Sequence, residues 1–158
     1  MTPRPAHEGS NIHATAVVIG TRGVLIAGPS GSGKTMLALE LVRRAQAACR
    51  FGRLLADDRV WVGANAGRLL CRAPREIAGL AEVRGFRPAP VPHVGAAVID
   101  LLVRLVPAAQ APRMADDAAE TIAGCDLPRL DLPERHCIAA ALAIEAWLSA
   151  CGRSQAPG

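Results

Sequence analysis

One short segment near the start of the chain constrains the fold more than any other feature. It consists of Gly28, Pro29, Ser30, Gly31, Ser32, Gly33, Lys34 and Thr35, which is the Walker A pattern G-x-x-x-x-G-K-[ST]. Glycines let such a backbone curl so that several N–H groups point inward at phosphate oxygens. A helix that starts directly after the loop adds the positive end of its dipole. The segment therefore predicts a phosphate-binding loop between a strand and a helix.

Two side chains of this loop indicate which phosphate compound it binds. Lys34 is the only lysine in the chain, so its place in the motif is hard to ascribe to chance. In this position a lysine supplies a full charge to the β- and γ-phosphates, and the hydroxyl of Thr35 can ligate Mg²⁺. We therefore expect ATP and Mg²⁺ to bind here.

Apolar patterning places the loop in the context that the motif requires. Residues 14–19 and 24–27 are apolar on either side of a glycine-flanked turn, which predicts a β-hairpin directly before the loop. In residues 36–48 apolar side chains recur every three or four positions, which predicts a helix of about four turns. Further strands are expected at 54–56, 60–62, 68–72 and 96–106, a short helix at 74–80, a loop at 107–112 and a final helix at 132–150.

Charged residues outside the loop supply the other candidates for chemistry. Asp57 and Asp58 end the strand that follows the loop's helix, where P-loop proteins commonly place a carboxylate that reaches the metal. A second carboxylate there can take a proton from an attacking hydroxyl, although a charged turn has the same sequence. His13, Glu82 and Arg113 are weaker candidates on pattern alone. His13 is a catalytic or a structural histidine, Glu82 a metal ligand or a solvated charge, and Arg113 a phosphate clamp or a surface residue.

Length and composition fit a single folded domain. The chain has 158 residues, of which 51% are hydrophobic and 20% charged, as in globular proteins. We expect one P-loop domain over residues 12–151 between flexible ends at 1–11 and 152–158. These ends are rich in proline, glycine and polar residues.

Charge and cysteine usage exclude several classes of function. The formal charge of +4 comes from arginines that are scattered and not interleaved with aromatic residues, so nucleic-acid binding is not expected. No apolar stretch reaches the roughly 18 residues of a membrane span, and the polar N-terminus does not read as a signal peptide. None of the five cysteines forms a C-x-x-C pair. We therefore expect a cytoplasmic protein with reduced thiols.

Together these segments resemble the catalytic domain of the HPr kinase/phosphorylase family. The resemblance is carried by His13, by residues 23–41 around the loop, by residues 53–60 with the aspartate pair, and by Glu82-Val83-Arg84-Gly85. It covers residues 12–115 well and the last helix loosely, and the chain is similar to short bacterial forms that have the catalytic domain only. The resemblance implies an α/β fold. It would be a P-loop nucleotide-binding core like that of phosphoenolpyruvate carboxykinase, with helices flanking a mixed β-sheet.

The resemblance also implies an activity and a role for each candidate. The family uses ATP to phosphorylate a serine on HPr, a small phosphocarrier protein, so it implies a protein serine kinase acting on an HPr-like or related signalling protein. Lys34 would hold the β- and γ-phosphates. Thr35 and Glu82 would bind the Mg²⁺, and Asp57 would lie near it. Asp58 would accept the serine proton. His13 would orient Asp58, and Arg113 would be an active-site arginine.

Assembly and direction of reaction follow from the same resemblance. The family forms hexamers through its catalytic domain, which implies a homo-oligomer. Its signature continues Arg-Gly-Leu-Gly, whereas this chain reads Arg84-Gly85-Phe86-Arg87-Pro88, which changes the freedom of the backbone there. In the family this stretch is associated with reversal of the reaction by phosphate, so the resemblance does not lead us to expect that reversal here. Two other functions stay open on the sequence: a small-molecule P-loop kinase, and a non-catalytic ATP-sensing regulator of a signalling protein.

Overall fold

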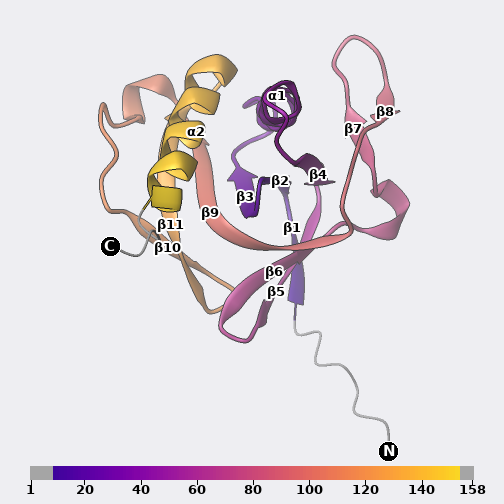
Figure 1. Cartoon of the computed structure of the whole chain (residues 1–158), viewed down its shortest axis with the longest axis horizontal. Helices are drawn as coiled ribbons and strands as arrows, with labels where there is room; N and C mark the ends of the chain where they lie inside the picture. Colours follow the sequence, from indigo (N-terminus) through magenta and orange to yellow (C-terminus); the bar gives the residue numbers. More distant parts are fainter. Residues whose placement is uncertain (1–8, 154–158) are drawn as a thin grey trace, which may run out of the picture.

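The computed structural model describes residues 9–153 as a curled mixed β-sheet with two helices on one face (Figure 1). The sheet contains β1 (Gly9–Ile12), β2 (Ala14–Ile19), β3 (Arg22–Ala27), β4 (Gly52–Ala56), β5 (Val60–Asn65), β6 (Arg68–Arg72), β9 (Ala96–Val106), β10 (Ala119–Ile122) and β11 (Cys125–Pro133). The helices are α1 (Lys34–Ala47) and α2 (Cys137–Arg153). A separate ribbon is made by β7 (Leu80–Glu82) and β8 (Pro88–Pro90), and short 3₁₀ turns form at Arg75–Ile77 and Ala108–Gln110.

The long strand β9 organises the sheet. One edge of β9 pairs in parallel with β3, while its other edge pairs antiparallel with β6 near the start and parallel with β11 near the end. The strands thus run in the order β1-β5-β6-β9-β3-β2-β4, with β10 and β11 branching from β9. Figure 1 shows the sheet curling so that the β5–β6 hairpin lies on the side away from α1 and α2. The α/β fold with a mixed sheet and flanking helices is therefore confirmed.

Two apolar clusters fill the two sides of this sheet. Successive side chains of a strand point to opposite faces, so Val24 and Ile26 pack with Leu37 of α1, whereas Leu25 packs with Leu102 on the other face. All five cysteines are free thiols, as the sequence predicts. Burial raises the pKa of the Cys71 thiol in the second cluster to about 12, so this cysteine is a neutral core residue.

Three predicted elements differ from the structure. The final helix begins at Cys137 and not at residue 132, because residues 129–133 pair in parallel with β9 as the end of β11. The predicted helix at 74–80 is only the 3₁₀ turn Arg75–Ile77, and Leu80 already belongs to β7. Residues 9–11, expected in a flexible N-terminus, pair with β5 as part of β1. Residues 1–8 and 154–158 of the expected flexible ends lie outside the described residues.

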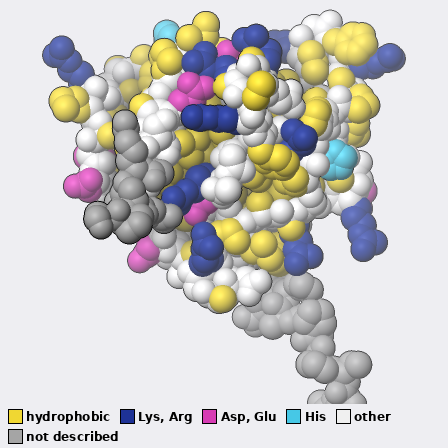
Figure 2. Space-filling view, in the orientation of Figure 1, with side chains coloured by type: hydrophobic (Ala, Val, Ile, Leu, Met, Phe, Trp, Pro, Cys, Tyr) yellow, Lys and Arg dark blue, Asp and Glu magenta, His cyan; other side chains and the backbone are white. Residues whose placement is uncertain are grey.

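The surface shows no single basic face on the side seen in Figure 2. Arginine side chains there are dispersed among apolar and uncharged groups. Within residues 9–153, no helix combines the length and apolar character needed to cross a membrane.

The carboxylate of Glu120 on β10 is hydrogen-bonded to an arginine of β9 and to one of β11, and the strength of these contacts depends on pH. Glu120 accepts hydrogen bonds from Arg104 Nε at 2.7 Å and from Arg129 at 3.3 Å. The hydrogen bond from Arg104 is the largest cause that lowers the pKa of the Glu120 carboxyl below its usual value.

We expect Glu120→Gln to lower the free energy of unfolding at neutral pH but not in acid. Because the folded-state pKa lies below the unfolded one, the stabilisation is present above the unfolded pKa of roughly 4.3. It is lost as the pH falls through the folded pKa, so the two proteins converge in acid. Urea unfolding at neutral pH and near pH 3 measures this, and a stability gap that does not change with pH would contradict it.

Candidate functional site

The phosphate loop leaves the end of β3 and leads directly into α1. Gly31 and Gly33 have φ angles of 79° and 95°, in the left-handed region where glycine alone is unstrained. The N–H of Ser32 donates to the carbonyl of Pro29 at 3.1 Å, which closes a tight turn inside the loop. Helix α1 starts at Lys34, one residue after Gly33, so its first N–H groups face the space that the loop encloses.

Polar groups inside the loop fit an anionic ligand. The Lys34 side chain is only 6% exposed, and its ammonium group donates to the carbonyls of Gly28 at 2.9 Å and Pro29 at 3.1 Å. The hydroxyl of Ser32 is buried and makes no hydrogen bond to any described residue. A buried unpartnered hydroxyl is unfavourable unless a ligand or water satisfies it. The loop therefore has the donors and the charge that a polyphosphate requires.

Asp57 holds the loop's helix to the neighbouring strands. This carboxylate is buried, and it accepts from the hydroxyl of Thr35 at 2.7 Å and from that of Thr15 at 3.0 Å. Its other oxygen accepts from the N–H of Glu82 at 2.8 Å. Asp57 therefore connects α1, β2 and β7 to the end of β4.

Asp58 faces the opposite way from Asp57. Its φ of 68° lies in the left-handed region, which aspartate tolerates better than most residues. The turn exposes the carboxylate, and Oδ1 contacts Nε2 of His13 in an ion pair or hydrogen bond. The Asp58 N–H donates to the Thr15 hydroxyl at 3.3 Å. One aspartate is thus buried beneath the site while the next is presented to solvent.

A pocket of about 680 Å³ collects most of the candidates. The predicted residues among those that line it are His13, Ser30, Gly31, Ser32, Gly33, Lys34, Thr35, Asp58 and Glu82. Asp57 lies below the pocket through its bond to Thr35. The structure does not bring Arg113 to this pocket, because Arg113 is exposed in the segment between the second 3₁₀ turn and β10.

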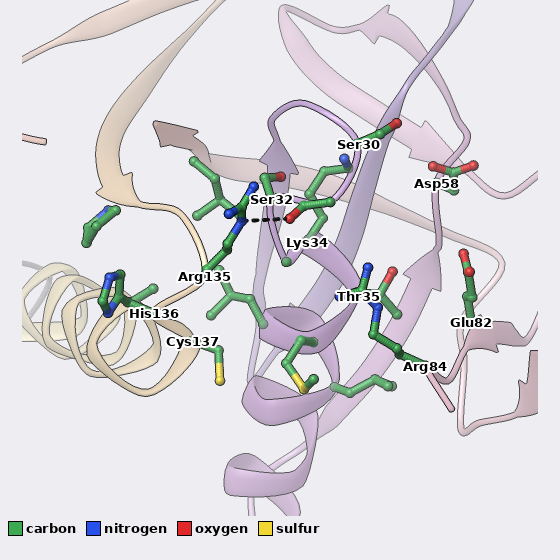
Figure 3. Close-up of a pocket in the computed structure, with 18 of the residues that line it drawn as sticks. Ser30, Ser32, Lys34, Thr35, Asp58, Glu82, Arg84, Arg135, His136 and Cys137 are labelled. Atoms are coloured by element: carbon green, nitrogen blue, oxygen red, sulfur yellow. Dashed lines mark hydrogen bonds between the residues drawn. The ribbon is translucent and has the colours of Figure 1, made fainter. Parts of the chain in front are cut away.

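The pocket also contains residues that the sequence did not single out. Figure 3 shows Asp58, Glu82 and Arg84 on one side of the loop and Arg135, His136 and Cys137 on the other. Arg135 and His136 belong to a segment that the sequence assigned to the final helix, so nothing in the sequence indicated that they precede α2 in a turn.

Thr15 is a second residue that sequence reasoning missed. It is fully buried, and its hydroxyl donates to Asp57 while accepting from the Asp58 N–H. The sequence feature that could have identified it is that Thr15 is a single polar residue within the apolar run of β2.

We expect Thr15→Val to lower the free energy of unfolding by about 1–3 kcal/mol, because it leaves a buried carboxylate short of a donor. Thr15→Ser keeps the hydroxyl and should retain most of the stability. Urea unfolding followed by circular dichroism compares the two variants. Equal midpoints for the valine and serine proteins would show that the hydroxyl does not support Asp57.

Magnesium fits this site only together with a nucleotide. Among the described residues there is no group of three or more His, Cys, Asp or Glu side chains able to hold a metal. Nucleotide-bound Mg²⁺ needs only one or two protein ligands, since phosphates and waters supply the rest. The Thr35 hydroxyl donates its proton to Asp57, which leaves its oxygen lone pairs for a cation.

These features define a P-loop domain of the α/β class. A glycine loop closed over a buried lysine lies between a strand and a helix, and a hydrogen bond between a threonine and an aspartate links the helix to the end of a neighbouring strand. Residues 6–151 match the HPr Serine kinase C-terminal domain family, and the chain belongs to this family.

Several known proteins are similar to this chain in sequence. An HPr kinase/phosphorylase of Limosilactobacillus reuteri is 38% identical over 135 residues, covering 78% of this chain and 40% of that protein. One of Streptococcus thermophilus is 46% identical over 79 residues, covering 49% of this chain and 24% of that protein. The chain thus spans at most about 40% of the length of these relatives.

A solved structure extends the likeness to the whole fold. The Hpr(Ser) kinase/phosphatase from Coxiella burnetii superposes with a TM-score of 0.76 at 24% identity, covering 92% of this chain and 97% of that one. At this identity the likeness concerns the fold alone.

Proposed function

We propose that the chain is an ATP- and Mg²⁺-dependent protein serine kinase whose acceptor is an HPr-like phosphocarrier or a related signalling protein. Family membership supports a kinase. One observation carries the finer proposal: a single pocket contains the phosphate loop with Lys34, the Thr35 hydroxyl bonded to Asp57, and the exposed His13–Asp58 pair. Phosphoryl transfer needs these three parts, which are a phosphate cradle, a metal-side hydroxyl and a base.

The residues divide the reaction between them. The loop amides and Lys34 hold the β- and γ-phosphates, so that the γ-phosphorus faces the serine hydroxyl in line with the bond to ADP. Asp58 takes the hydroxyl proton as the serine O–P bond forms and the bond to ADP breaks. His13 contacts the Asp58 carboxylate and keeps it oriented toward the acceptor. Mg²⁺, when bound, would neutralise phosphate charge, and Thr35, Asp57 and Glu82 would hold it or its waters.

The proposal is tested by following labelled phosphate. The protein is incubated with Mg²⁺ and ATP labelled in the γ-phosphate, together with a purified HPr-like phosphocarrier or a lysate of its host. Label on a serine of one protein, abolished by EDTA, is the expected result. Label that enters only small molecules would favour a small-molecule kinase, and tight ATP binding without any transfer would favour a sensor. Addition of phosphate should release little pyrophosphate from the labelled product.

Assembly and location are part of the same proposal. We propose a cytoplasmic homo-oligomer that binds neither nucleic acid nor membrane. The exposed side chains of Ile138 and Leu142, four residues apart on α2, are 63% and 54% exposed and favour contact between copies. Sedimentation of the purified chain tests this, and a monomer at all concentrations would contradict it.

A further inference from the structure

The pocket has two ends of different chemistry, with the phosphate loop between them. Ionisable side chains gather at one end, where Asp58, Glu82 and Arg84 lie together in Figure 3. At the other end the wall is largely apolar, with Leu105, Pro133 and Ala140 among its residues, and no carboxylate of the described residues lines it. Among the described residues, the polar side chains there are the planar, basic Arg135 and His136 and the thiol of Cys137. An elongated ligand held by the loop therefore meets charged groups at one end and a largely apolar wall at the other.

The turn that carries these two side chains is fastened to the loop. The N–H of Arg135 donates to the carbonyl of Ser32 at 3.0 Å. The Nε of Arg135 donates to the carbonyl of Gly31 at 3.3 Å, which is the dashed line in Figure 3. Arg135 also has a φ of 60°, a conformation that a long side chain adopts only when its surroundings impose it. The Arg135 backbone thus keeps a fixed position relative to the phosphates that the loop would hold.

We propose that the turn with Arg135 and His136, together with the apolar wall beside it, forms the subsite for the base and sugar of the nucleoside triphosphate. This inference rests on the proposed function, in which Asp58 deprotonates the acceptor. The γ-phosphate must then face Asp58, so the α-phosphate and the nucleoside leave the loop at the opposite end, where Arg135 and His136 lie. Planar guanidinium and imidazole groups can stack on the face of any nucleobase. A total volume of about 680 Å³ is in the range of small-molecule sites and accommodates both ends of the ligand.

Two probes separate the nucleoside from the phosphates. ATP and inorganic tripolyphosphate carry the same chain of three phosphates, but only ATP has a base and a sugar. Binding of each, with Mg²⁺, is measured by calorimetry for the full chain and for His136→Ala and Arg135→Gly. Glycine suits the positive φ of residue 135 and keeps the N–H that bonds to Ser32. Arg75→Ala, which removes an exposed arginine that does not line the pocket, is the matched control.

The inference predicts that the two substitutions act on ATP alone. Each should raise the Kd of ATP about five- to tenfold, as expected for loss of one stacking partner, and change the Kd of tripolyphosphate less than about twofold. The control should change neither. If the substitutions weakened binding of ATP and of tripolyphosphate equally, the turn would contact the phosphates. If they changed neither Kd, the nucleoside would bind elsewhere and this end of the pocket would be free for the acceptor protein. Either result overturns the inference while the phosphate loop stands. Failure of the wild-type chain to bind either probe would overturn the proposed function as well.

Photolabelling gives a readout that does not depend on variants. ATP carrying an azide on the adenine, irradiated in the complex, should label a peptide within residues 133–140. Label confined to the peptide that contains Glu82 and Arg84 would overturn the inference, because it would place the base at the charged end.

Discussion

Lys34→Ala is expected to abolish phosphoryl transfer, with a loss of about a thousandfold or more in rate. The ammonium group is the one full positive charge that the structure builds into the loop, and it is buried there against the carbonyls of Gly28 and Pro29. Without it, the charge that develops on the transferred phosphoryl group has no partner at its loop side. Those two carbonyls also lose their donor, so the loop is less firmly held in its curled form.

The two contributions of Lys34 are separated by a second variant. Lys34→Met keeps a long unbranched stem in the same buried position but has no charge, so it should fail in transfer as completely as the alanine variant. Initial rates with labelled ATP measure both, and circular dichroism checks that they are folded. A methionine variant that retained more than about a tenth of the rate would show that the charge is not what the loop contributes.

The sequence predicted the elements that have strong local signals. The glycine loop, the preceding hairpin and the helix after it were confirmed, because turn residues and apolar spacing specify such units within a few positions. Strand β11 was missed. Its Pro128 and Pro133 argue against a strand. Residues 129–133 become a strand by pairing in parallel with β9, which is distant in the sequence, while the first part of β11 pairs with the adjacent β10, which was missed as well.

The candidate site was predicted in the same uneven way. His13, Asp58 and Glu82 do line one pocket with the loop, as the family resemblance implied, whereas Arg113 does not. Thr15 and Arg135 were not anticipated. The first acts through a buried hydrogen bond, and the second depends on where a turn after β11 meets the loop. Both contacts are consequences of tertiary packing. Thr15 was marked only by being a polar residue in the apolar run of β2, and nothing local marked Arg135.

Asp58→Asn is expected to retain ATP binding and to lose transfer. Asparagine keeps the shape of the side chain and tolerates the φ of 68° at this position, but it cannot accept the serine proton. General base catalysis contributes about 10²–10⁴-fold, so the turnover rate should fall by that range while the Michaelis constant for ATP changes little. Unchanged turnover would remove Asp58 from the chemistry.

Neighbouring variants distinguish a base from a merely nearby charge. Asp57→Asn should instead weaken binding of Mg²⁺ with ATP, because Asp57 holds the Thr35 hydroxyl from a buried position and does not reach the acceptor. His13→Gln can still hydrogen-bond to Asp58 and leaves the proposed base in place, so it should lower turnover less than Asp58→Asn does. Steady-state rates against ATP and Mg²⁺ concentration separate the three patterns. If His13→Gln lost as much turnover as Asp58→Asn while Asp58→Asn kept the wild-type pH profile, the histidine and not the aspartate would be the base.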